Sequence, residues 1–305
     1  MADEVFYSGL GDVRAAEILD QRIHLLLADR QSLRNHPAIM QFGDQSGTGS
    51  TVLSVPFAGF DGYDLMAAVA ENASTSNTAL TDASATITIA RQALQYQMSD
   101  LANLTDSVGV SVERIAQSMV GSAEMRATEM ILNVTDDFSS SVGTSGADMT
   151  VDDFFDAQFT LTLANVTGPI VSVLHTRQLT DLQNSLRAEG GAIQFISATQ
   201  DMLSVKGVGF VGSLNGVDIY ASSKVPTANA GADRAGAMFG LGAVGIAEGS
   251  PRPIQGAGFV FPAGRRIMVE FERDAGYAYT KVVGNYYAGV AILQDALGVS
   301  IITDA

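Results

Sequence analysis

The sequence predicts an α+β fold built on an elongated frame, and three stretches lead to that prediction. Residues 110–137 form the longest uninterrupted helix signal in the chain. Residues 276–293 alternate between apolar and other side chains for much of their length, which is unusually long for a strand. Between them, residues 150–188 alternate short strand and helix signals, which is typical of a compact α/β subdomain.

The long helix has a continuous apolar face and an uninterrupted interior. Its apolar residues recur every three or four positions and are Val112, Ile115, Met119, Ala123, Ala127, Met130 and Val134. No proline interrupts it, and Gly121 costs only about 1 kcal/mol relative to alanine. A helix of this length spans ~40 Å. We expect its apolar face to pack on the late ribbon, near residues 277–290.

Composition points to a chain that shares its surface with other chains. The chain has 305 residues, of which 47% are hydrophobic. This is enough to form a sizeable hydrophobic core in one large domain or in two modest domains. Only 16% are charged, against about a quarter in a typical soluble domain. We therefore expect other chains to cover part of the surface. The alternative is a neutral surface rich in Ser, Thr, Asn and Gln.

The charge balance and the missing cysteines exclude several classes of protein. The net charge is −16 and only three residues are lysine, which argues against gripping nucleic acid through its phosphates. Enclosing nucleic acid without adhering to it remains compatible. The absence of cysteine excludes disulfides and thiolate metal sites. No signal peptide and no membrane-length apolar run is found, so we expect a soluble intracellular protein without a membrane partner.

The first part of the sequence predicts an N-terminal arm followed by a long hairpin. Residues 1–11 resemble an untethered arm, and residues 13–30 predict a helix. Strands are predicted at 51–57 and 85–89. The segment between them is small and polar, so it needs a partner surface to be stable. The alternative is a disordered loop.

Further elements follow in order. The period of residues 90–98 fits both helix and strand; we predict a strand to Gln97 and a short helix at 99–106. Thr150 and Asp153 resemble a capping box that begins a helix. The remaining predicted elements are a strand at 169–174, a helix at 176–188, and strands at 217–222, 237–241 and 266–272.

This order of parts resembles the major capsid protein of tailed bacteriophages, the Hong Kong 97-type fold. Residues 85–117 are similar to that family's strand, short helix and entry to its spine helix. Residues 212–226 and 237–249 are similar to two of its successive strands, and residues 271–293 resemble its closing ribbon. The order of these stretches along the chain is what makes the resemblance specific. The resemblance covers nearly the whole chain.

The resemblance implies a division into parts and a role for each. The implied parts are an N-terminal arm (1–48), an extended loop (49–84), a peripheral domain (85–149 and 262–290, with a spine helix at 110–137) and an axial domain (150–261 and 291–305). It implies a subunit that self-assembles through pentamers and hexamers into an icosahedral shell around double-stranded DNA. The shell would belong to the virion and form in the host cytoplasm. An acidic lining would let DNA slide in without sticking.

Some capsid proteins of this family carry a covalent cross-link between subunits or a fused scaffolding segment, and the sequence bears on both. Some members link the extended loop to a neighbour through a lysine–asparagine bond. The first lysine here is Lys206, so residues 49–84 cannot supply one, and we predict no such cross-link. No long charged helical segment precedes the arm, and the sequence starts at Met1. We therefore expect a separate scaffolding protein, with a portal and a decoration protein as further candidate partners.

One glycine motif offers an alternative function. Residues Gly240–Gly245, GLGAVG, match the dinucleotide fingerprint G-x-G-x-x-G after a strand. Gly249, Pro251 and Pro253 follow closely, and they disfavour the helix that would hold a pyrophosphate. We predict a strand and a turn there, and a dinucleotide-dependent enzyme stays the competing function from another class.

The remaining candidate residues favour structural roles. His24, His36 and His175 lack the spacing of a metal site, and we expect His175 to cap a helix. The acidic pairs Asp136/Asp137 and Asp152/Asp153 fall at a helix end and a helix start. Arg265 and Arg266 are predicted to be an intersubunit pair or solvated.

These predictions together assign no catalytic, cofactor-binding or metal residue, and we expect a structural protein that is not an enzyme. Within the same fold, an encapsulin-like bacterial compartment is the competing function.

Overall fold

The long helix forms as α3, Val110–Thr135, and it ends two residues earlier than predicted. Asp136 and Asp137 lie in the turn that follows, so two carboxylates sit at the negative end of the helix dipole. Burial, and then the charge of neighbouring Asp137, raises the pKa of the Asp136 carboxyl. Gly121 is accommodated within the helix.

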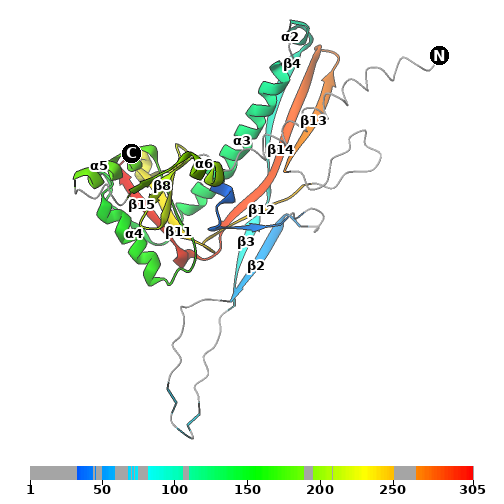
Figure 1. Cartoon of the computed structure of the whole chain (residues 1–305). Helices are drawn as coiled ribbons and strands as arrows, with labels where there is room; N and C mark the ends of the chain where they lie inside the picture. The colour runs from blue at the N-terminus through cyan, green and yellow to red at the C-terminus, as the bar shows by residue number, and fades with distance from the viewer. Residues whose placement is uncertain are drawn as a thin grey trace, which may run out of the picture.

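The computed structural model describes residues 33–43, 45, 50–58, 68–69, 71, 73–74, 82–105, 110–188, 195–207, 209–250 and 266–304. The predicted arm helix at 13–30, His24, Arg265 and most of the segment between the predicted hairpin strands lie outside these residues. Figure 1 shows a lobe, a long arm that leaves it at an angle, and a hairpin that projects away from both. This arm consists of α3 and the sheet along it, and it is a different part of the chain from the predicted N-terminal arm.

A five-stranded sheet runs along α3 and forms the arm (Figure 1). Its centre is β14, which pairs with β4 along one edge. Along its other edge, the first part of β14 pairs with β13 and the last part pairs with β12, and all three pairings are antiparallel. β1 joins in parallel to β12. The bounds are β1 Ile39–Phe42, β4 Ala90–Ser99, β12 Val244–Glu248, β13 Ile267–Asp274 and β14 Tyr279–Ile292.

The predicted ribbon is confirmed as the turn-linked pair β13 and β14, with one correction. The strand was predicted from residue 276, but β14 begins at Tyr279. Tyr277 lies in the connecting turn, where its ring stacks on that of Tyr279. It therefore takes no part in the contact with α3.

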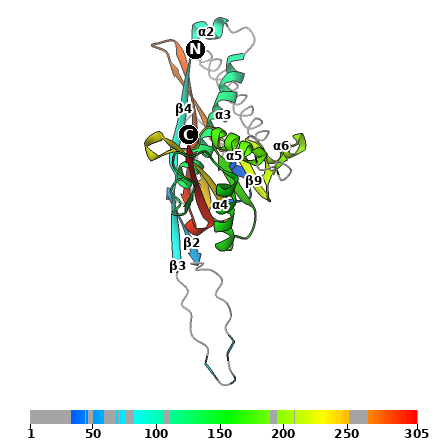
Figure 2. The ribbon, with the colours of Figure 1, turned by 90° about the vertical axis from the view of Figure 1, so that its left-hand side faces the viewer.

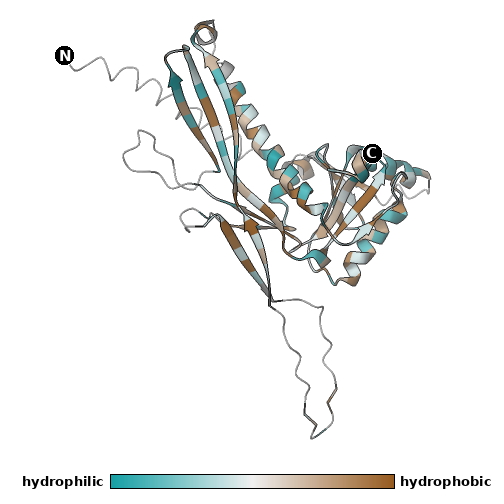
Figure 3. Ribbon diagram, turned by 180° about the vertical axis from the view of Figure 1, so that it is seen from behind, coloured by the Kyte–Doolittle hydropathy of each residue, from teal (hydrophilic) through white to brown (hydrophobic). Residues whose placement is uncertain are grey.

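The helix packs on this sheet, as the sequence predicted. Met119 and Val120 of α3 are buried with Ile267 and Val282. Figure 3 shows apolar and more polar residues alternating along the strands of the arm. On β4 the alternation leaves Gln95 and other odd-numbered residues exposed. The ambiguous stretch 90–98 is thus a strand, because β14 pairs with it along its whole length. A short helix, α2, Asp100–Thr105, follows it.

An eight-stranded sheet forms the lobe, in the order β5-β15-β11-β6-β9-β8-β7, with β10 also paired to β11. The bounds are β5 Ser141–Val142, β6 Ile170–Leu174, β7 Phe195–Ser197, β8 Phe210–Leu214, β9 Val217–Ala221, β10 Thr227–Ala228, β11 Asp233–Gly240 and β15 Gly298–Asp304. Its helices are α4 Val151–Leu163, α5 Thr176–Ala188 and α6 Gln200–Lys206, with 3-10 turns at η1 Leu33–Asn35, η3 Asn229–Gly231 and η4 Asp295–Leu297.

The two faces of this sheet are covered by different helices. On one face, α4 and α5 bury Phe154, Leu161 and Leu182 in one apolar cluster. On the other face, the last turns of α3 contribute Ile131 and Leu132 to a second cluster, against which α6 also packs. The C-terminal part of α3 therefore belongs to the core of the lobe, while its earlier part lies on the arm.

A buried glutamine joins α5 to the sheet. The Gln178 side-chain amide donates to the carbonyls of Arg234 and Ile301 and to the Thr303 hydroxyl, at 2.9–3.1 Å. Its oxygen accepts the His175 backbone N–H at 3.0 Å. His175 Nδ1 in turn accepts the Arg177 N–H at 3.3 Å, so His175 caps the helix as predicted. The sequence did not single out Gln178.

The hairpin consists of β2, Val52–Ala58, and β3, Asp82–Thr88, which pair only with each other among the described strands. Val55 and Ile87 anchor its root in an apolar cluster with Ala247 of the arm sheet. The root crosses β14 at Gly289, where a Cβ would overlap the Thr88 carbonyl. Only glycine allows this approach.

An ion cluster joins η1, β12, β14 and α3 to the residue before β13, where the arm meets the lobe. Glu248 at the end of β12 accepts hydrogen bonds from Arg34 Nε at 2.7 Å, Arg266 Nε at 3.1 Å and the Tyr286 hydroxyl at 2.6 Å. Arg266 also pairs with Glu124 of α3. The Arg266 side chain is only 14% exposed, so the prediction of an intersubunit or solvated arginine is wrong for this residue.

The surroundings of Glu248 determine how its charge depends on pH. Burial opposes the charged form, but Arg266 and Arg34 outweigh burial and hold the Glu248 pKa below its ordinary value of 4.5. Since the unfolded carboxyl binds protons more tightly, these ion pairs stabilise the fold fully above pH 4.5. That contribution is lost as the pH falls through the lowered folded pKa.

We expect Glu248→Gln to lower the free energy of unfolding at pH 7 by about 3 kcal/mol, because it leaves two arginines without their buried partner. Urea unfolding at several pH values measures this. The variant should also lose part of the stability change that the wild type shows below pH 4.5. Glu272→Gln, which removes a carboxylate that is 68% exposed, is the matched control. Equal stability of the two variants would contradict the role of the cluster.

We expect Gly289→Ala to lower the free energy of unfolding by about 1–3 kcal/mol, because its methyl group would push the hairpin root off β14. Gly276→Ala is the control, since the atom nearest to its Cβ would be Asp274 Oδ1 at 3.5 Å. Urea unfolding of both variants decides the matter, and an equally small effect at the two positions would refute the close approach.

Candidate assembly interface

The glycine motif lies in a turn between two strands. Gly240 ends β11, and Val244 begins β12 after a turn in which Gly242 has a φ of +94°. A strand follows the motif where a dinucleotide site needs the N-terminus of a helix. The predicted strand and turn are therefore confirmed. A Cβ at Gly240 would collide with Val166, so the glycine serves packing.

His36 is held as a neutral structural residue. The Ala38 N–H donates to Nδ1 at 3.1 Å, so Nε2 carries the proton and faces Asp218 Oδ2 at 3.2 Å. Burial chiefly lowers the His36 pKa. Lys206 also contacts Asp218, at 2.5 Å. The cluster joins the start of β1 to the lobe. No group of three His, Asp or Glu residues in the described part of the chain could hold a metal ion.

The second acidic pair begins α4 as predicted. The Thr150 hydroxyl accepts the Asp153 N–H at 3.2 Å, and the Asp153 carboxylate accepts the Thr150 N–H at 2.9 Å. This reciprocal pair is a capping box. Asp153 is thus committed to the helix start, while Asp152 is exposed beside it.

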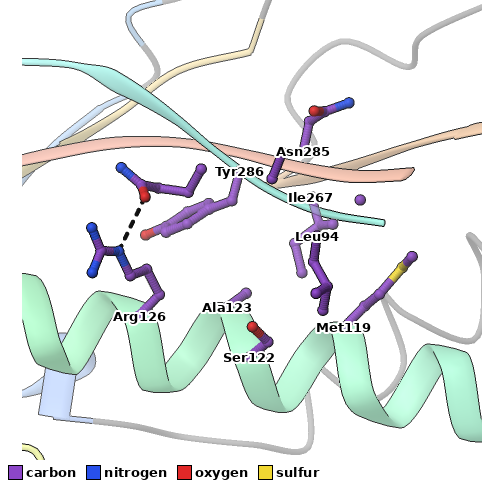
Figure 4. A pocket seen from close by; sticks show the side chains of 11 residues that line it. Leu94, Met119, Ser122, Ala123, Arg126, Ile267, Asn285 and Tyr286 are labelled. Carbon is purple, nitrogen blue, oxygen red and sulfur yellow. Dashed lines mark hydrogen bonds between the residues drawn. The ribbon is translucent and has the colours of Figure 1, made fainter. Parts of the chain in front are cut away.

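A small cavity lies between α3 and the arm sheet (Figure 4). Its volume is about 230 Å³, and Leu94, Met119 and Ile267 line much of it. In Figure 4, Tyr286 points toward the helix and Asn285 points away from it. At one end Arg126 donates to Gln92 at 3.1 Å and pairs with Glu129 at 2.8 Å. Arg126, the charged residue of the cavity lining, is thus already paired, and we interpret the cavity as a gap in the packing.

Large apolar side chains are exposed at several places in the described part of the chain, among them α2, α4 and α6. At the tip of the arm, Leu101 and Leu104 of α2 are 72% and 82% exposed. On α4, Phe159 and Leu163 are 61% and 66% exposed. On α6, Val205 is also exposed. Apolar side chains grouped in this way mark surfaces that a partner covers.

In Figure 2, β3 continues the line of β4 away from the tip of the arm, with β2 beside it. On the face of the hairpin opposite to Val55 and Ile87, the side chains of Ser54, Pro56 and Thr86 are exposed. A two-stranded hairpin is marginally stable without further packing. The packing of Val55 and Ile87 on the arm sheet supplies part of that stability. The described helices include none that is both long and apolar enough to cross a membrane.

Sequence comparison finds no relative, since no protein-family model and no curated protein matches the chain. Structural comparison finds several. The capsid of Ralstonia phage GP4 matches with a TM-score of 0.62 at 12% identity, over 92% of this chain and 90% of that chain. The holo-SrpI encapsulin complex from Synechococcus elongatus PCC 7942 matches with a TM-score of 0.61 at 12% identity, over 90% of each chain.

A third structure, from Mycobacterium phage Che8, matches with a TM-score of 0.52 at 16% identity, over 83% of this chain and 85% of that chain. These matches cover between 83% and 92% of this chain. At such low identity they establish the fold. The chain has the α+β capsid fold of the Hong Kong 97 type.

Proposed function

We propose that this protein is the subunit of a closed icosahedral shell and that its partner is chiefly itself. The projecting hairpin is the observation that carries the proposal. One face of its described strands packs on its own chain through Val55 and Ile87, while the opposite face, which carries Ser54, Pro56 and Thr86, is exposed, so we expect another copy to cover that face. The exposed apolar groups on α2 and α4 supply further contact surface.

The more specific proposal is a major capsid protein that encloses the double-stranded DNA of a tailed phage. Its support is the capsid identity of the phage structures that share the fold, together with a net charge of −16. An acidic shell lining repels the phosphate backbone, so DNA packs without adhering. The subunit would act by assembly, as part of the virion, and would form no catalytic site. A scaffolding protein and a portal would assist it during assembly in the host cytoplasm.

An encapsulin-like compartment is the second candidate. The match to the SrpI encapsulin complex has nearly the same TM-score as the match to the GP4 capsid, which is the observation in its favour. The contents of particles from the native source separate the two, since nuclease-protected DNA indicates a virion and an enclosed protein indicates a compartment.

Shortening the hairpin tests the proposed function directly. Replacing residues 58–82 by Asn-Gly keeps the root pairs and closes the hairpin with a two-residue turn. We expect the variant to show the wild-type unfolding midpoint but no closed particles in negative-stain microscopy. The wild type, expressed in the same way, should form closed shells or rings. Wild-type protein that stays monomeric would overturn the proposal, as would a shortened variant that assembles normally.

The lysine pattern gives a separate prediction for assembled particles. Because Lys206 is the first lysine, the hairpin cannot donate an amine to a neighbouring chain. We expect assembled particles boiled in detergent to run as a single band at the mass of one chain, 31.9 kDa. A ladder of covalent multimers would contradict this prediction.

A further inference from the structure

The exposed side of α4 carries an apolar ridge. The helix buries Val151, Phe154 and Leu161 against the lobe sheet. Phe155, Phe159 and Leu163 follow one another at intervals of four residues, so they form one stripe along the helix. Phe159 and Leu163 are among the most exposed large apolar residues of the described chain. The ridge is thus built to meet a surface outside its own chain.

Two carboxylates accompany this ridge. Asp152 and Asp156 are both exposed, and they lie one helical turn apart beside Phe155 and Phe159. Neither forms an ion pair within the described part of the chain. A covering surface therefore has to be apolar at its centre and basic at its edge.

A groove of matching character lies where α3 meets the lobe. It has a volume of about 440 Å³ and runs between α3 and the loop that follows β9. Small residues, Gly121 and Ser122, line its α3 side next to Met125, which is an exposed apolar residue. Figure 1 shows that α3 leaves the lobe at an angle there and forms an inner corner with it.

The free cation of this groove is Lys224. Arg126 also lines the groove, but it is already paired with Glu129 at 2.8 Å. Lys224 is exposed, and the ion pairs of the described residues do not include it. The groove thus offers one large apolar side chain, Met125, beside the Arg126–Glu129 pair and the unpaired ammonium group of Lys224.

The ridge and the groove lie on opposite faces of the lobe. α4 packs with the apolar cluster on one face of the eight-stranded sheet. Val225, next to Lys224, packs with the cluster on the other face, together with Ile131 of α3. The two surfaces cannot meet within one chain. Between copies they form a head-to-tail contact, which repeats into a ring when the rotation closes.

We infer that the α4 ridge of one copy packs into the α3–Lys224 groove of the next. Phe159 and Leu163 cover Met125, and the Lys224 ammonium faces Asp152 and Asp156 of the neighbour. The small side chains of Gly121 and Ser122 let the ridge approach α3 closely. This inference rests on the proposed shell function and names the contact that joins its neighbouring subunits.

Chemical cross-linking tests the contact on wild-type particles. A carbodiimide condenses an amine with a carboxylate that touches it, and takes up the water that is lost. Lys206 and Lys281 already face Asp218 and Glu272 of their own chain, so their products stay within one chain. We expect a detergent-resistant ladder, with Lys224 joined to Asp152 or Asp156 in the mass spectrum. Lys224→Arg keeps the charge but cannot be coupled, so it should assemble normally and give no ladder.

Charge exchange provides a second readout. Lys224→Glu should raise the protein concentration needed for half-maximal assembly at least about tenfold, because like charges then face each other. Adding Asp152→Lys and Asp156→Lys to that variant should restore assembly to within about threefold of the wild type. Unfolding midpoints of the unassembled proteins check that each variant folds.

The outcomes separate this inference from the proposed function. Wild-type shells that give no Lys224 cross-link, or that tolerate Lys224→Glu, overturn the inference and leave the shell function standing. A wild-type protein that never assembles overturns both. Cross-links from Lys224 to a carboxylate of another copy outside α4 also overturn the inference, because they place another surface in the groove; a link to Glu129 of its own chain, which lines the same groove, is set aside as intrachain.

Discussion

The architecture depends on a single helix that serves two apolar cores. The middle of α3 packs on the arm sheet through Met119 and Val120, and its end fills the core of the lobe through Ile131 and Leu132. A helix is stiff over this length, so it fixes the direction of the arm relative to the lobe. The cluster around Glu248 reinforces the same junction, since it ties α3, β12 and β14 together.

An elongated frame of this kind has too much surface for one chain to cover. The hairpin and the tip of the arm project away from both cores, and large apolar side chains remain exposed on α2 and α4. The low charge content fits the same picture, because surfaces buried between subunits need few charges. In the proposed shell, contacts between copies would cover these surfaces.

The sequence predicted the elements whose patterns are local. The period of α3, the alternation of β14 and the capping box at Thr150 are each contained within one segment, and all three are confirmed. The strand β15, Gly298–Asp304, was missed because it gains its stability from pairing with β11, which is remote in the sequence. The partners of Arg266 and of Gln178 were missed for the same reason. Contacts between distant residues leave no periodic signal in either segment.

The surfaces for assembly were predictable only in outline. A small, polar stretch between two strands indicated that the hairpin needs a partner, and that inference used sequence alone. The α4 ridge required the structure, because Phe154 and Phe155 look alike in the sequence and only packing shows which is buried. The proposed role of Lys224 likewise required the structure, because only the structure shows that it lines a groove beside α3.

Hydrogen–deuterium exchange of the unassembled and the assembled protein tests the central claim most directly. If the frame is complete in one chain and the hairpin is completed by a neighbour, amides of α3 and β14 are protected in both states. Amides at the outer end of β2 and β3 should then exchange rapidly in the free subunit and become protected at least about tenfold on assembly. Equal protection of the hairpin in both states would contradict the account, as would an α3 that becomes protected only in the shell.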